Sequence, residues 1–153
     1  SERLRLSRKV STVISLTIRK HMRPGFLVHQ PLTERAIYRF LRDLGEEALE
    51  VLLLSFADRL AAKGLLSSQD ELRKHQDLVV RLVKEYFHRK EKYAARKRLL
   101  TGNDLMERFG LAPGPIIGRL LAELEEAEMT GRVKTKEEAL ELAAELMEEW
   151  RGK

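Results

Sequence analysis

Cysteine is absent from this sequence of 153 residues. Without cysteine there is no disulfide framework and no thiolate metal site, two devices that often stabilise small domains. A chain of this length buries roughly 68–70% of its unfolded surface and can therefore fold around a hydrophobic core without such devices. The absence also fits a reducing compartment, so we expect a cytoplasmic location.

Long apolar runs are missing too. No stretch approaches the ~20 consecutive apolar residues that span a bilayer, and an amphipathic pattern begins directly after Ser1. We therefore expect no membrane partner and no targeting segment. Ser1 in place of methionine fits a fragment of a longer protein.

Several patterns that carry catalysis are missing as well. The sequence has no Asp-x-Asp pair, no glycine-rich phosphate loop of the P-loop or dinucleotide kind, and no serine nucleophile with a recognisable paired base. His29, His75 and His88 form no metal-ligand spacing of their own. We therefore expect no catalytic residue and no bound cofactor in this chain alone.

Charge is distributed unevenly along the chain. Residues 1–100 hold 22 Lys and Arg against 12 Asp and Glu, whereas residues 101–153 hold 7 against 12. The two regions therefore carry net charges of +10 and −5. A basic region followed by an acidic one is typical of a protein that holds a polyanion on one side, because long-range charge steers such partners. An ordinary basic protein is the alternative.

Hydrophobic residues recur with the helical period throughout, and no stretch alternates with period two for long enough to predict a strand. The sequence therefore predicts an all-α fold of about seven helices with short loops, arranged as a helical bundle-like array. We divide it into a basic helical region, residues 1–100, and a C-terminal helical region, residues 101–153, packed on it.

Local signals set the first predicted helix limits. A helix over about residues 3–22 ends at Pro24, and residues 26–32 form a loop. Thr33 caps the next helix, which Gly45 closes.

Two further helices follow in the basic region. The helix over residues 46–63 is apolar around most of its circumference, so we expect it to form the buried centre of the domain. The next helix begins near Asp70 and runs for about thirty residues. Because that exceeds the usual globular length, it either breaks near His88 or projects as a spine.

The stretch from Thr101 to Val133 is rich in glycine and proline and organises the C-terminal region. Thr101 caps a short helix that Gly110 ends, and a longer helix begins at about Pro115. A last helix begins with the capping box that Thr135 forms with Glu138.

One segment combines cations with aromatic rings. The stretch KEYFHRKEKYAARKR holds seven Lys and Arg against two Glu, with aromatic residues interleaved. Cations neutralise phosphates and aromatic faces stack on unpaired bases, so the mixture favours RNA. A solvated helix end whose aromatic residues belong to the core is the alternative. The candidate RNA-binding residues are Lys84, Arg89, Lys90, Lys92, Tyr93, Arg96, Lys97 and Arg98, with Tyr93 as the expected stacking side chain.

The order of several segments resembles a known family. The run LLTGNDLMERFGLAPGPIIGRLLAELEEAEMTGRVKTKEEALELA is similar to the C-terminal region of bacterial tRNA nucleotidyltransferases and poly(A) polymerases that carry an HD-type domain. The resemblance continues upstream through LRLSRKV, HMRP and RAIYRFLRDLGEEALEVLLLSFADRLAAKG. It implies a helical part that binds tRNA and positions the RNA 3′ end for a nucleotidyl transfer site outside this chain.

The same resemblance implies what the chain lacks. In that family, magnesium and CTP or ATP are expected only at a separate N-terminal catalytic head, which would be a partner of this chain along with the tRNA. His21 in HMRP and Asp58 in FADRLA resemble the last His and Asp of the HD metal pattern. Two such ligands make a poor metal site, so a structural role for both is the more natural interpretation and we expect no bound metal.

Two other functions stay open. The chain could be part of an HD-type, metal-dependent phosphohydrolase that works when further ligands are supplied. It could also be a helical protein-interaction module, with the acidic helices after Glu123 as its contact surface.

Overall fold

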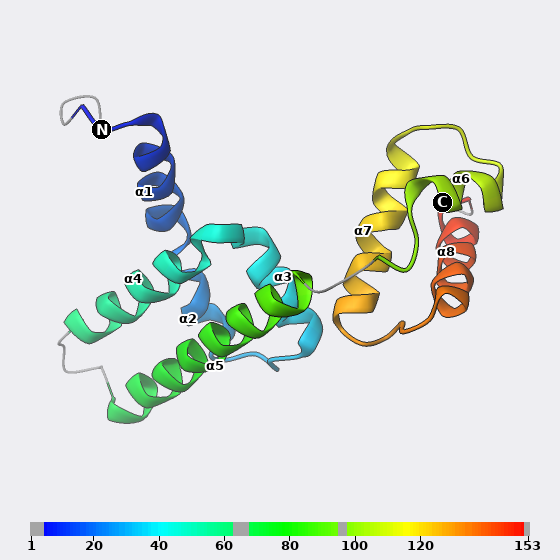
Figure 1. Ribbon diagram of the computed structural model, residues 1–153. Coiled ribbons are helices and arrows are strands. Elements are labelled where there is room, and N and C mark those ends of the chain that lie inside the picture. Colours follow the sequence, from blue (N-terminus) through cyan, green and yellow to red (C-terminus); the bar gives the residue numbers. More distant parts are fainter. Residues whose placement is uncertain (1–4, 63–67, 95–97, 152–153) are drawn as a thin grey trace. The chain divides into compact units, whose positions relative to one another are not determined.

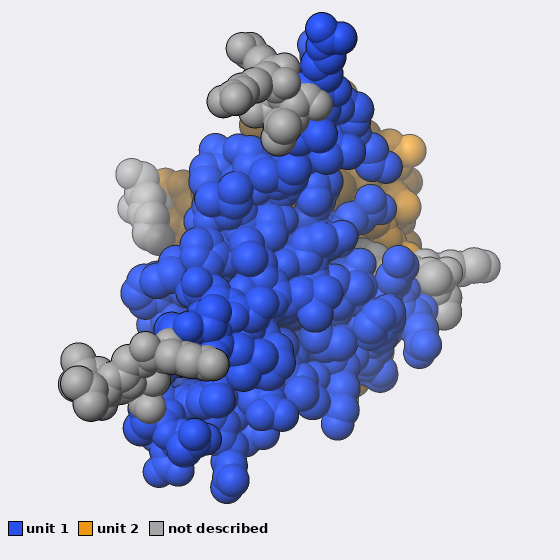
Figure 2. All heavy atoms as spheres, turned by 90° about the vertical axis from the view of Figure 1, so that its left-hand side faces the viewer, with its two compact units in different colours: residues 1–94 blue, residues 95–153 orange. Residues whose placement is uncertain are grey.

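The computed structural model describes residues 5–62, 68–94 and 98–151 (Figure 1). In these ranges the chain forms eight α-helices and one short 3-10 helix and contains no strand, which confirms the predicted all-α class. None of the described helices is long and apolar enough to cross a membrane. The chain divides into two compact units, residues 1–94 and residues 95–153, coloured separately in Figure 2. We call them unit 1 and unit 2; the predicted packing of the C-terminal region on the basic region stays a prediction.

The first helices of unit 1 correct one sequence prediction. Helix α1 spans Arg8–Lys20, with the Ser7 hydroxyl accepting from the Val10 amide, and α2 spans Arg23–Leu27. The predicted loop over residues 26–32 is therefore wrong at its beginning. Pro24 lies in the first turn of α2, where its missing N–H costs no helical hydrogen bond, so it belongs to a new helix.

Helices α3 and α4 follow closely. Helix α3 spans Glu34–Leu44; the Thr33 hydroxyl accepts from the Ala36 amide at 3.1 Å, as predicted. Gly45 closes α3 with a φ of 59°, a left-handed value that glycine adopts without strain. The 3-10 helix η1, Gly45–Glu47, leads into α4, Ala48–Ala61.

Helix α5, Gln69–Ala94, is the longest element. It is continuous over 26 residues, so it does not break near His88. The Ser68 hydroxyl accepts from the Glu71 amide at its start. The core of unit 1 lies between α3, α4 and α5 and consists of Ile37, Phe40, Leu41, Leu44, Ala48, Val51, Leu52, Leu78, Val79 and Leu82.

Helix α4 is less buried than its composition predicts. Val51 and Leu52 are fully buried, but Leu53 is 64% exposed and Leu60 is 48% exposed. Apolar residues around most of a helix indicate burial only when neighbours cover every side, and here α4 has one exposed side. The prediction that α4 forms the buried centre is therefore correct for one face only.

Over its described residues, 98–151, unit 2 forms three helices: α6 over Gly102–Phe109, α7 over Pro115–Met129 and α8 over Lys136–Arg151. Their ends follow the predicted signals: Thr101 forms a capping box with Asp104, and Gly110 adopts the left-handed conformation after α6. The predicted Thr135–Glu138 box precedes α8. The core of unit 2 consists of Leu100, Leu105, Ile117, Leu120, Leu124, Ala127, Val133, Ala139, Leu142, Ala143 and Met147.

Candidate nucleic-acid interface

Helices α3 and α5 contact one another in unit 1 and carry many of its exposed Lys and Arg side chains. The buried side of α5 follows helical spacing through His75, Leu78, Leu82 and Arg89. The polar members of this stripe, His75 and Arg89, are 4% and 7% exposed. The face of α5 that packs in the core of unit 1 therefore also buries two polar side chains.

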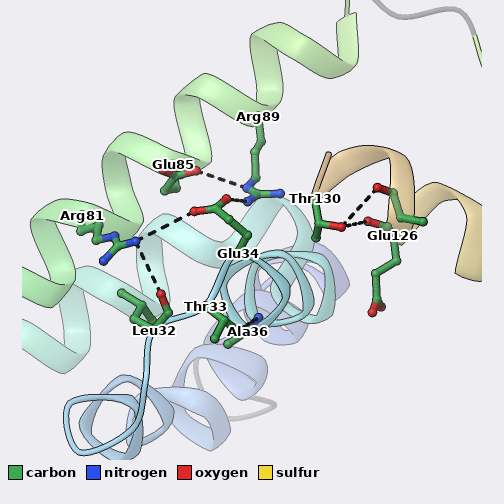
Figure 3. Close-up of polar contacts among 10 residues, drawn as sticks. Leu32, Thr33, Glu34, Ala36, Arg81, Glu85, Arg89, Glu126 and Thr130 are labelled. Carbon is green, nitrogen blue, oxygen red and sulfur yellow. Dashed lines mark hydrogen bonds and ion pairs between the residues drawn. The ribbon is translucent and has the colours of Figure 1, made fainter. Parts of the chain in front are cut away.

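Arg89 is held by carboxylates (Figure 3). Its Nη2 atom donates to Glu34 Oε2 at 2.8 Å, and its Nε atom lies 3.4 Å from Glu85 Oε2. Glu34 also lies 3.9 Å from Arg81 Nη2, so this carboxylate bridges two arginines of α5. The pairing joins the first turn of α3 to the second half of α5 and offsets much of the Arg89 charge.

The other predicted cations of α5 are exposed but do not share one face. Lys84, Lys90 and Lys92 all reach solvent. At about 100° per residue, Lys84 and Lys92 project roughly 80° apart, whereas Lys90 projects about 120° from Lys84 on the other side. The helix therefore presents these cations around a wide arc, and Arg89 is directed into unit 1.

The remaining predicted residues lie at or beyond the end of α5. Arg96, Lys97 and the Tyr93 side chain lie outside the described residues. Arg98 is the first described residue of unit 2; its side chain is 64% exposed and its Nη2 atom lies 3.8 Å from Glu125 Oε2. The role of the whole predicted set in RNA binding stays a prediction.

Sequence reasoning missed three arginines on α3. Arg35, Arg39 and Arg42 are exposed and recur at i, i+4 and i+7, so they share one side of the helix. Arg42 lies 3.5 Å from Asp43 and stacks near the Tyr38 ring at 5.6 Å from its centroid. Their spacing, opposite a buried apolar face, is the sequence signal that would have found them.

His21 and Asp58 line one pocket of about 100 Å³, together with His29, Ser55, Arg59, Glu71 and His75. Several of these groups contact one another or the backbone: His21 Nδ1 lies 2.6 Å from the Ile18 carbonyl oxygen, and Ser55 Oγ lies 3.2 Å from His75 Nε2. Burial, and then the nearby Arg59 charge, lower the pKa of His75. Within the described ranges no three His, Asp or Glu side chains are placed to hold a metal ion.

Comparison with known proteins gives a consistent result. The family model "tRNA nucleotidyltransferase domain 2 putative" matches residues 5–144. A CC-adding tRNA nucleotidyltransferase of Synechocystis is 26% identical over 145 residues, which are 95% of this chain and 32% of that protein. An A-adding tRNA nucleotidyltransferase of Deinococcus radiodurans is 32% identical over 82% of this chain and 28% of its own length.

A CC-adding tRNA nucleotidyltransferase of Thermus thermophilus is 30% identical over 136 residues, 89% of this chain and 28% of that protein. The chain thus spans about a third of the length of the relatives it matches. No solved structure matches it significantly.

Proposed function

Because this chain belongs to the tRNA nucleotidyltransferase domain 2 family, we propose that it is the tRNA-binding helical part of a tRNA nucleotidyltransferase. It holds the tRNA so that the RNA 3′ end reaches a nucleotidyl transfer site outside these 153 residues. Relatives named as CC-adding and A-adding enzymes support this proposal.

The observation that carries the proposal is the concentration of cations in unit 1. Residues 1–94 hold 19 Lys and Arg against 12 Asp and Glu, whereas residues 95–153 hold 10 against 12. Exposed members lie on both α3 and α5, which contact one another. Cations on adjacent helices suit a ligand recognised by its backbone and shape, as folded RNA is.

The experiment compares two triple variants of equal charge change. In the first, Lys84, Lys90 and Lys92 of α5 become alanine. In the control, Arg8, Lys9 and Arg19 of α1, which are also exposed, become alanine. We expect the α5 variant to weaken tRNA binding and to flatten the dependence of log K on log salt by about 2 to 3, since each phosphate contact contributes about 0.7–0.9. Equal losses of tRNA affinity in both variants would show that net charge alone sets the affinity. The α5 lysines would then not form a specific binding site.

A catalytic region outside this chain is part of the same proposal. Helix α1 exposes Val10, Ile14 and Ile18 at four-residue spacing, and α4, which contacts α1, exposes Leu53 and Leu60. The relatives are about three times as long as this chain, so a further region of such a protein can cover these apolar stripes.

A double variant tests that assignment. Ile18→Asp with Leu53→Asp is expected to leave the melting temperature of this chain unchanged, because both side chains are exposed. The same change should lower the melting temperature of the chain when it is joined to its catalytic region. If the joined protein is equally stable with and without the substitutions, another surface is the contact.

A further inference from the structure

We propose that the hollow between α3 and α5 of unit 1 binds a single unstacked nucleotide of the RNA. The inference rests on the proposed RNA-binding function and adds to it a defined binding site and the chemical class of its ligand. It concerns a pocket distinct from the one that contains His21 and Asp58.

The pocket has the size and composition of a small-ligand site. Its volume is about 480 Å³, within the roughly 300–1,000 Å³ that small-molecule sites occupy. Three elements build it, since α3, η1 and α5 each contribute side chains or backbone. The lining residues are Tyr38, Leu41, Arg42, Gly45, Glu46, Tyr86, Arg89 and Lys90.

Tyr86 is the side chain placed to stack on a base. It packs partly against the core of unit 1 and is half-buried, so the rest of its surface lines the pocket. Phe87 meets its ring edge-on at 5.4 Å between centroids and thereby orients it. Tyr38 is only 3% exposed and acts as a wall, with the guanidinium groups of Arg42 and Arg89 within 6 Å of its ring centroid. A planar base next to Tyr86 gains stacking energy without sequence readout.

The charged residues that line the pocket suit different parts of a nucleotide, the cation its phosphate and the carboxylate its ribose or base. The Lys90 ammonium group is exposed and lies 5.9 Å from the Tyr86 ring centroid, so a base on that ring brings its own phosphate within reach of Lys90. The Glu46 carboxylate can accept a hydrogen bond from a ribose hydroxyl or from the amino group of a base. Arg42 lies at the exposed rim, where its guanidinium group pairs with the Asp43 carboxylate at 3.5 Å.

Arg89 supplies a further donor from the floor of the pocket. Its Nη2 atom donates to Glu34 and its Nε atom forms an ion pair with Glu85, as Figure 3 shows, but neither its buried Nε atom nor its buried Nη1 atom has a hydrogen-bond acceptor among the described residues. A buried donor without a partner is costly, and because these atoms are closed to solvent, a ligand oxygen or ring nitrogen removes that cost only when the side chains around Arg89 shift on binding. A purely apolar ligand would leave it unsatisfied, which favours a ligand that carries acceptors.

The experiment titrates adenosine 5′-monophosphate into the isotopically labelled chain and follows amide chemical shifts by NMR. We expect shifts on α3, η1 and the second half of α5. Lys90→Ala and Tyr86→Leu should each weaken the binding, Tyr86→Leu by about fivefold to a hundredfold, the range that loss of base stacking gives. Tyr86→Phe keeps the ring and should bind as the unchanged chain does. Arg73→Ala serves as the charge control, because it lies on α5 about 25 Å from Lys90 and is also exposed.

Parallel measurement of tRNA affinity separates this inference from the proposed function. If tRNA and the mononucleotide both bind, and Lys90→Ala and Tyr86→Leu weaken both, the pocket holds an RNA nucleotide. If tRNA binds but the mononucleotide shifts no pocket amide and Tyr86→Leu leaves tRNA affinity unchanged, the pocket inference is overturned and the proposed function stands. If the mononucleotide binds in the pocket and tRNA does not bind, the proposed function fails, and with it the RNA assignment of the pocket.

Discussion

His75 is a buried histidine whose neutral form the fold favours. Burial and the charge of Arg59 lower its pKa below the ordinary 6.5, although the Ser55 hydrogen bond acts in the opposite direction. The unfolded chain therefore binds a proton more readily than the folded chain does between the lowered pKa and 6.5. In that window the free energy of unfolding falls as the pH falls.

The prediction is that His75 makes unit 1 less stable as the pH drops below about 6.5, with the effect levelling off below the folded-state pKa. Thermal melts between pH 8 and pH 5 measure it. His75→Gln, which cannot titrate, should show a flatter dependence of melting temperature on pH in this window. If both proteins lose stability in parallel, another group is responsible.

Glu34 neutralises Arg89, which is nearly buried, whereas Glu34 itself is 55% exposed. Glu34→Gln keeps a hydrogen-bond acceptor but removes the charge, so we expect a loss of about 1–2 kcal/mol in the free energy of unfolding. Asp43→Asn is the control, because Asp43 pairs with Arg23 and Arg42 at the surface, where such pairs contribute at most ~1 kcal/mol. Urea unfolding measures both variants; a larger loss in Asp43→Asn would contradict the account.

At the scale of elements, Asp104 connects the beginnings of α6 and α8. It accepts from Lys136 Nζ at 2.6 Å and from the Thr101 backbone amide at 2.8 Å. The Lys136 hydrogen bond, and then those from Thr101, hold the pKa of Asp104 far below its usual 3.8. The ionised carboxylate therefore contributes stability above pH 3.8, and that stability is lost as the pH falls through the lowered pKa.

We therefore expect Asp104→Asn to lower the melting temperature of unit 2 at pH 7 and the difference from the unchanged chain to narrow on acidification below about pH 4. Amide hydrogen exchange of α6, compared between Asp104→Asn and the unchanged chain at several pH values, measures this loss of stability and its pH dependence. Glu148→Gln, which removes an exposed carboxylate from α8, should leave exchange in α6 unchanged. If the stability difference between Asp104→Asn and the unchanged chain stays constant down to the lowest pH, the charge of the Asp104 carboxylate does not contribute to the stability of unit 2.

The helix limits that the sequence predicted well are those set by local chemistry. Thr33, Thr101 and Gly110 act within a single turn, so their residue types suffice to predict a helix end. Pro24 was misread because proline both ends one helix and begins another, and local sequence does not choose between them. The exposed side of α4 depends on which helices cover it, which is a property of the tertiary packing.

The candidate site was predicted less completely for the same reason. The basic composition of α5 is visible in the sequence, but the inward position of Arg89 depends on Glu34, 55 residues earlier in the chain. The pocket beside Tyr86 needs α3, η1 and α5 together, so no single segment shows it.

At the scale of the whole molecule, each unit has a hydrophobic core of its own. We therefore expect residues 1–94 and residues 95–153 to fold as separate polypeptides, which circular dichroism can check. Unit 1 carries a net charge of +7 and unit 2 a net charge of −2, so unit 1 alone should retain most of the salt-dependent tRNA affinity. Tighter binding by unit 2 would place the interface outside α3 and α5.

The tRNA-binding function is tested by measuring how the whole chain binds tRNA and a matched DNA duplex across a salt titration. We expect tighter binding to tRNA than to DNA, with log K for tRNA falling linearly with log salt by about 0.7–0.9 for each of several phosphate contacts. Absence of binding, or equal affinity for tRNA and DNA, would contradict it and leave the cations of α3 and α5 as a solvated surface.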